Sequence, residues 1–129
     1  MAYQILGNIS AIILFFQISL FILRRVYIFL HKYLHIKPSW FPPILKFLKN
    51  AHIYTGITLL VIGFIHGFLA LGTIKLHTGF ILWLGILFAF IGFLFKKKVG
   101  KKWIVYHRTF GFVILALFFL HYYFPWIIK

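Results

Sequence analysis

Apolar residues fill four long stretches of this 129-residue chain, and polar or basic residues separate them. The stretches begin near Ile5, Ala51, Thr78 and Trp103. An apolar helix of about 20 residues can cross a lipid bilayer. We therefore expect four transmembrane helices, at about residues 5–30, 50–74, 77–96 and 103–126. The predicted fold is all-α, an integral membrane four-helix bundle formed by a single domain over residues 1–129.

The segment between the first two helices is the one long connection. Pro38, Pro42 and Pro43 lie in it, and proline interrupts a helix. Trp40 and Phe41 are aromatic residues of the kind that gather at the lipid–water interface. We expect residues 31–49 to form a linker along the cytoplasmic interface. The other two connections are short, so the second and fourth helices are predicted to run parallel.

All charged side chains are basic: the chain has 14 Lys and Arg and no Asp or Glu. Lys75 and Lys129 fall on one side of the predicted membrane. Twelve fall on the other side, namely Arg24, Arg25, Lys32, Lys37, Lys46, Lys49, Lys96, Lys97, Lys98, Lys101, Lys102 and Arg108. Basic residues concentrate in cytoplasmic loops. This asymmetry predicts a multi-pass plasma-membrane protein with both termini outside and basic loops in the cytoplasm. Because the charges flank apolar stretches, nucleic-acid binding is not expected.

The missing residue types exclude much chemistry. Without carboxylates there is no acid/base dyad and no hard-cation cage. Without cysteine there is no thiolate nucleophile, iron–sulfur cluster or covalently attached haem. No glycine-rich nucleotide-binding loop is present. Histidine, with seven copies, is the remaining residue type suited to ligating a cofactor.

Four histidines form two pairs with identical spacing. His52 and His66 lie 14 positions apart on the second helix, and His107 and His121 lie 14 apart on the fourth. Fourteen residues bring a helix back to within about 40° of the same face, roughly 21 Å further along its axis. On parallel helices, His52 is then level with His107, and His66 with His121. This pattern predicts two non-covalent, bis-histidine b-type haems, with an inner iron between the first pair and an outer iron between the second.

Neighbouring residues extend the pattern. Gly56 and Gly111 each follow a histidine by four positions, where a missing side chain would leave room for a macrocycle. Arg108 is a candidate partner for an inner haem propionate. The alternative for His52 and His107 is an ordinary interfacial polar group. A zinc or copper site would instead need its ligands gathered at one point.

The other three histidines carry weaker signals. His31 and His35 lie four positions apart among Lys and Tyr, as solvated or interfacial residues do. His77 opens the third helix beside Lys75. An interfacial role is expected for His77, and contact with a quinone, a haem propionate or a transferred proton is the alternative.

Residues 51–125 resemble the ferric-reductase-like transmembrane domain and, in their two parallel histidine-bearing helices, cytochrome b. The segment from Tyr106 to Tyr123 carries the H-R-x-x-G start and the second histidine of that pattern. The segment from His52 to Gly67 repeats it less completely, with Ile53 where an arginine would stand. The resemblance implies a transmembrane electron path through two haems. No flavin- or NADPH-binding domain is expected after the fourth helix, so in a reductase-like protein a flavoprotein donor would be a separate redox partner.

Three functions compete at this point. The leading expectation is a dihaem cytochrome b subunit that carries electrons between a quinol or flavoprotein donor and an acceptor across the membrane. Such a chain would be an electron-transfer subunit of an oxidoreductase rather than an enzyme alone. The second is a haem-bearing membrane anchor for a larger oxidoreductase. The third is a cofactor-free small membrane protein, in which case the histidine spacing would be a coincidence.

Overall fold

The computed structural model of the protein describes residues 1–128, so Lys129, counted above among the outer charges, lies outside the described residues. The described chain is helical and contains no strand, which confirms the all-α prediction. Its elements are α1 (Ala2–Tyr33), α2 (Phe41–Leu71), α3 (Thr78–Leu94), α4 (Lys96–Val99), η1 (Gly100–Lys102) and α5 (Trp103–Tyr123).

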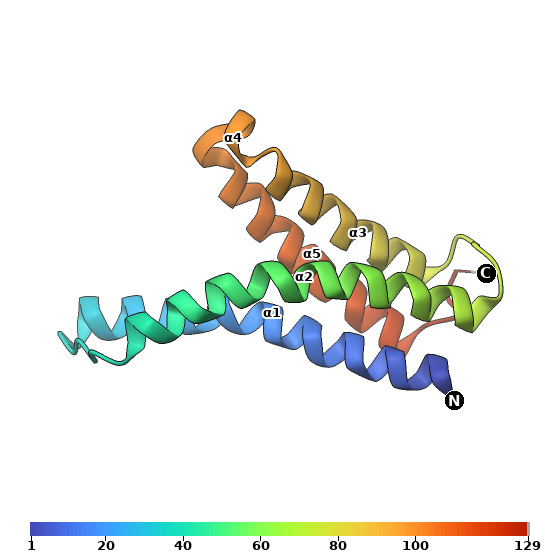
Figure 1. The fold of residues 1–129 in the computed structure, drawn as a ribbon, viewed down its shortest axis with the longest axis horizontal. Coiled ribbons are helices and arrows are strands. Elements are labelled where there is room, and N and C mark those ends of the chain that lie inside the picture. Colours follow the sequence, from blue (N-terminus) through green and yellow to red (C-terminus); the bar gives the residue numbers. More distant parts are fainter. Residues whose placement is uncertain (129) are drawn as a thin grey trace.

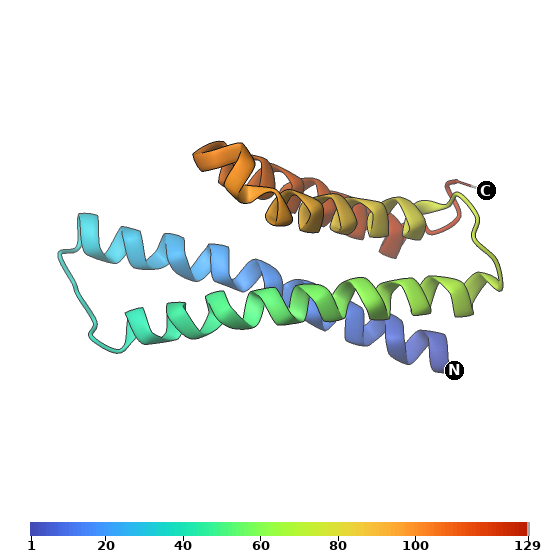
Figure 2. The same cartoon turned by 45° about the horizontal axis from the view of Figure 1, so that its top comes forward.

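The four long helices form two antiparallel pairs (Figure 1). α1 packs along α2, α3 packs along α5, and the pairs also meet where α2 touches α3. Figure 2 shows the two pairs as separate layers, with α2 and α5 running in the same direction. Both basic connections lie at one end of the bundle, and the two chain termini lie at the other end.

The predicted linker over residues 31–49 is wrong for most of its length. α1 continues to Tyr33, and α2 begins at Phe41. Pro42 and Pro43 lie in the first turn of α2, where the backbone N–H groups have no helical partner in any case. A proline there removes no hydrogen bond, so these two residues start the helix rather than break it. Only residues 34–40 connect the two helices.

The remaining boundaries follow from local backbone chemistry. α2 ends at Gly72, whose φ of 67° is the left-handed conformation that glycine adopts without strain. α3 ends at Leu94, two residues before the expected limit, and the basic turn α4–η1 leads directly into α5. α5 ends at Tyr123, shortly before Pro125, because a proline disfavours helical geometry in the residue that precedes it.

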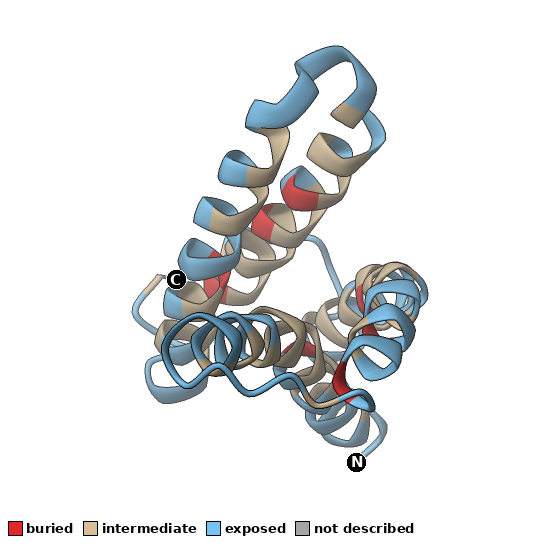
Figure 3. Ribbon diagram, turned by 90° about the vertical axis from the view of Figure 1, so that its left-hand side faces the viewer, coloured by how far each residue is buried: buried red, intermediate tan, exposed pale blue. Residues whose placement is uncertain are grey.

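Three helical segments are long and apolar enough to cross a membrane: Ala2–Tyr33, Phe41–Leu71 and Lys96–Tyr123. α3, with 17 residues, is at the lower limit for a span. The outer surfaces of the helices are apolar, as in Ile12 (69% exposed) and Phe47 (68% exposed). Figure 3 shows how few positions are buried, all of them on helix faces or ends that meet a neighbour. Such a surface is suited to lipid, so the fold is that of a membrane protein.

The centre of the bundle is a small apolar cluster with one residue from each long helix. Leu14, Leu59, Ala89 and Ile114 are each less than 10% exposed and pack together. Leu59 stands seven positions from both His52 and His66, and Ile114 stands seven from both His107 and His121. The cluster therefore separates the two histidine levels along the bundle.

Candidate functional site

His52 and His107 face each other between the two helix pairs. Their ring centroids are 5.8 Å apart, and their planes are inclined at 73°. A bond from a metal ion to an imidazole nitrogen is about 2 Å long, so rings on opposite sides of one ion have centroids about 6 Å apart. The nitrogen–metal–nitrogen line lies in the plane of each imidazole ring, so the two rings can be inclined to each other at any angle. The spacing of this pair therefore suits two axial ligands of one metal ion.

The tautomer of His107 is set by α3. Its Nδ1 lies 3.4 Å from the backbone oxygen of Ala89. A carbonyl oxygen only accepts hydrogen bonds, so Nδ1 carries the proton and Nε2 keeps its lone pair. Metal-ligating histidines commonly donate their second ring N–H to a carbonyl in this way. The Trp103 ring, centred 5.3 Å away, packs against the same imidazole.

His52 is held differently, through its backbone. The side-chain amide of Gln17 in α1 donates to the His52 carbonyl (3.0 Å) and to the Thr55 hydroxyl (2.9 Å). The Nδ1 atom of His52 is buried and has no hydrogen-bond partner within residues 1–128. Buried polar atoms are rarely left without a partner. This unpartnered imidazole is thus a candidate for a group that the polypeptide itself does not supply.

At the other level, His66 turns towards α1. Its Nδ1 donates to the backbone oxygen of Tyr3 (2.7 Å), which leaves the lone pair on Nε2. A Cβ atom on Gly7 would lie only 2.9 Å from Cε1 of His66. Real Cβ atoms essentially never approach that closely, so the ring can take this position only beside a glycine.

His121 turns towards the start of α3. Its Nδ1 is 2.9 Å from the hydroxyl of Thr78, and that hydroxyl also donates to the Pro125 carbonyl (3.1 Å). A Cβ atom on Gly79 would lie 2.9 Å from Cε1 of His121. The ring that faces His121 is that of His77, with centroids 5.5 Å apart. The structure thus places His66 and His121 at the same end of the bundle but against different helices, without the direct facing seen for the inner pair.

His77 has a structural task of its own as the residue that caps α3. Its Nδ1 accepts a hydrogen bond from the backbone N–H of Gly79 (3.1 Å), so in the neutral ring Nε2 carries the proton. Burial lowers the pKa of the His77 imidazole below its ordinary value. The cap acceptor is therefore retained to lower pH than in a free histidine.

The register of α1 against α2 aligns two polar contacts between these helices. Tyr3 and Gln17, which bond to His66 and His52, are themselves 14 positions apart on the antiparallel helix α1. Because both helices rise equally per residue, equal spacing brings both contacts into alignment. α1 thus forms hydrogen bonds with both histidines of α2, and α3 forms hydrogen bonds with both histidines of α5.

The other predicted site residues have mixed surroundings. Gly111 is exposed, and nothing lies within 4 Å of a Cβ atom built on it. Gly56 instead gives room to Gln17, whose Nε2 would lie 3.2 Å from a Cβ atom. Arg108 is partly buried beside His107, and the chain offers it no Asp or Glu partner.

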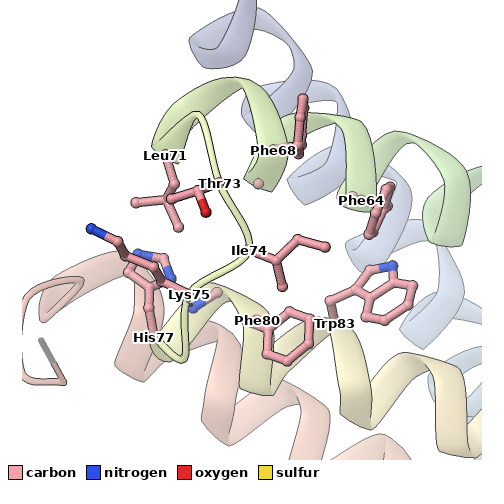
Figure 4. A pocket seen from close by; sticks show the side chains of 12 residues that line it. Phe64, Phe68, Leu71, Thr73, Ile74, Lys75, His77, Phe80 and Trp83 are labelled. Atoms are coloured by element: carbon pink, nitrogen blue, oxygen red, sulfur yellow. Dashed lines mark hydrogen bonds between the residues drawn. The ribbon is translucent and has the colours of Figure 1, made fainter.

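A small hollow lies between the ends of α2 and α3, and Figure 4 shows its lining. Ile74 of the connection extends into it between Phe64 of α2 and Phe80 of α3, while Lys75 and His77 lie at its edge. Its free volume of about 40 Å³ is enough for a few water molecules. A larger guest would have to displace Ile74.

Several residues of this site were missed by the sequence reasoning. They are Gly7, Gly79, Thr78, Gln17 and the carbonyl-bearing Tyr3 and Ala89. Only Gln17 carries a signal, as a buried amide within an apolar helix, because polar side chains in such a position usually serve an interhelical contact. For the others, the helix-to-helix register alone reveals the role.

The donor set differs between the two histidine levels. Within residues 1–128, no three metal-ligating side chains gather around one point, whereas a porphyrin needs only two axial ligands from the protein. At the inner level the ring spacing meets this need. At the outer level, His66 and His121 each keep a free Nε2 lone pair, but their rings do not face each other. Comparisons with known protein families, characterised proteins and solved structures found no match to this chain.

Proposed function

We propose that the chain is a dihaem b-type membrane cytochrome subunit that conducts electrons across the bilayer. The single observation that carries the proposal is the facing of His52 and His107, from helices far apart in sequence, at 5.8 Å. His52 and His107 would hold the inner haem, and His66 and His121 the outer haem. When bound, each haem would supply a one-electron couple, which the chain's own side chains lack.

The protein's own contribution is to orient the ligands and exclude water. Hydrogen bonds at Nδ1 leave the Nε2 lone pair of His66, His107 and His121 free. The apolar cluster around Leu59 and Ile114 separates the two levels and keeps that layer dry. Neutral imidazole ligates both oxidation states of haem iron, so electron transfer requires little rearrangement of these residues.

The electron donor is proposed as a chemical class, either a quinol or a flavoprotein. A quinol head group would approach at the edge marked by Lys75 and His77, where Nε2–H of His77 can donate to a quinol hydroxyl oxygen. A flavoprotein would instead dock at the basic end. There Lys97, Lys98 and Lys101 are exposed and attract an acidic partner over distance.

Haem content tests the proposal directly. We expect two haems per chain, with low-spin b-type bands in reduced-minus-oxidised spectra of the detergent-purified protein. His52→Ala or His107→Ala should remove one haem and leave the other. His31→Ala, at the exposed basic end, is the matched control and should keep both. A folded preparation without haem would overturn the proposal in favour of a cofactor-free membrane protein.

A second measurement separates an electron path from an anchor. The protein is placed in vesicles with an impermeant oxidant inside, and an impermeant reductant is added outside. Conduction should oxidise the external donor at a rate that His66→Ala and His107→Ala both abolish. If haem is bound but no electrons cross, the chain is an anchor whose haems serve the structure.

A further inference from the structure

Thr78 is the most deeply buried polar residue of the described chain, with 1% of its surface exposed. It is the first residue of α3, directly after the His77 cap. Its hydroxyl contacts two groups: Nδ1 of His121, near the end of α5, at 2.9 Å, and the carbonyl of Pro125, just after α5, at 3.1 Å. Placing a hydroxyl in an apolar environment is unfavourable unless it is hydrogen-bonded, and here it is bonded on both sides.

The hydroxyl has a single proton, which decides the direction of both bonds. The Pro125 carbonyl can only accept, so it takes that proton. The Thr78 oxygen therefore accepts from Nδ1–H of His121. The His121 ring is then held as the tautomer whose Nε2 has a free lone pair.

We infer that Thr78 is the positioning residue of His121: it selects the tautomer whose Nε2 keeps a free lone pair and fixes the ring in place. As a statement about an iron ligand, the inference rests on the proposed function. As a statement about the imidazole, it stands on the two hydrogen bonds and on Gly79, which leaves the ring the space it occupies.

Among the four paired histidines, His121 is the one whose tautomer a side chain decides. His66 and His107 donate to backbone oxygens, which no substitution removes. His52 has no partner at Nδ1 within residues 1–128. His77 does not compete for the same role, because its Nδ1 is engaged with the Gly79 N–H. A point substitution can therefore reverse the tautomer at His121 alone.

The first test needs no cofactor. ¹⁵N-histidine NMR of the haem-free protein in detergent distinguishes Nδ1–H from Nε2–H imidazoles, and the His121→Gln variant identifies the His121 signals by their loss. We expect His121 to be Nδ1–H in the native protein, to shift towards Nε2–H in Thr78→Val, and to return to Nδ1–H in Thr78→Ser. Native His121 in the Nε2–H form would overturn the inference even if Thr78→Val failed to fold. So would a folded Thr78→Val variant with an unchanged tautomer.

The second test uses the haem-loaded protein. Thr78→Val should weaken outer-haem retention about 10- to 100-fold, the usual effect of losing a ligand's hydrogen-bond partner. It should also raise one of the two midpoint potentials, because a less basic imidazole stabilises ferric iron less, and Thr78→Ser should restore it. Two unchanged potentials would overturn the role of Thr78 toward the haem. A native protein that binds no haem would overturn the proposed function, and the NMR result would still decide the role of Thr78.

Discussion

The paired histidines differ in what holds their imidazole rings. A backbone oxygen fixes His66 and His107, a hydroxyl fixes His121, and Gln17 holds His52 only through its carbonyl. At this scale, small residues matter as much as polar ones. Gly7 and Gly79 let a ring lie against a neighbouring helix where a methyl group would collide with it. Each histidine thus depends on a residue of the helix packed against its own.

Gly79 provides a direct test of this dependence. Gly79→Ala should displace the His121 ring, because the new Cβ would meet it at 2.9 Å, and should cost about 1–3 kcal/mol of stability. Thermal unfolding followed by circular dichroism in detergent measures the change. Gly92→Ala, in the same helix with nothing within 4 Å, is the control and should be neutral or stabilising by about 0.5–1 kcal/mol. Equal effects of the two substitutions would contradict the contact.

Gln17 links α1 to the inner histidine. Gln17→Leu removes hydrogen bonds to the His52 carbonyl and the Thr55 hydroxyl, and should destabilise the protein by about 1–2 kcal/mol. The same melting experiment reads this loss. Gln4→Leu, at an exposed position of the same helix, should change stability little. If both variants melt like the native protein, Gln17 does not tie these two helices together.

At the scale of elements, each helix pair is one ligand-bearing helix and one supporting helix. α2 and α5 carry the four paired histidines, while α1 and α3 supply their polar partners. The ends of the supporting helices therefore have to be placed accurately. α3 begins with a histidine cap, directly beside the residue that holds His121. A substitution of His77 should therefore also disturb the position of His121.

Replacement of the cap tests this expectation. His77→Leu removes the acceptor for the Gly79 N–H and should cost about 1 kcal/mol, whereas His77→Asn keeps an acceptor and should cost much less. Urea-induced unfolding in mild detergent compares the two variants. An equally stable His77→Leu variant would show that α3 does not need this cap.

At the scale of the whole molecule, charge and hydropathy are arranged along one axis. The basic connections lie at one end of the bundle and the termini at the other (Figure 1). α1 and α2, with 32 and 31 residues, are longer than the roughly 20 residues that a bilayer requires. Their extra turns lie at the basic end, where Arg24 and Lys49 mark the limit of the apolar stretches. This arrangement is the basis for predicting cytoplasmic basic loops.

Cysteine labelling can test that orientation, because the chain has no native cysteine. We expect Thr73→Cys, in the connection between α2 and α3, to react with an impermeant maleimide in intact cells. Val99→Cys, in the basic turn, should react only after lysis. Labelling of both sites in lysed cells controls for accessibility. The reverse pattern would invert the topology and exchange the inner and outer histidine levels.

The helices themselves were largely predictable, and the error at residues 41–49 is instructive. Hydropathy located all four long helices because apolar length is a local property of the chain. Pro42 and Pro43 were taken as breakers, although proline is tolerated in a first turn. The difference depends on where the helix begins, and the apolar pattern did not extend far enough to show it.

By itself, the sequence determined four apolar helices, a basic end, and two levels of histidines on parallel helices. Hydropathy, charge and the 3.6-residue period are local, so they can be read without the fold. Only the tertiary structure decided what each imidazole meets: His107 for His52, Tyr3 and Gly7 for His66, and Thr78 for His121. These contacts depend on the register and rotation of neighbouring helices. Packing of the entire bundle sets both, and no single helix encodes either.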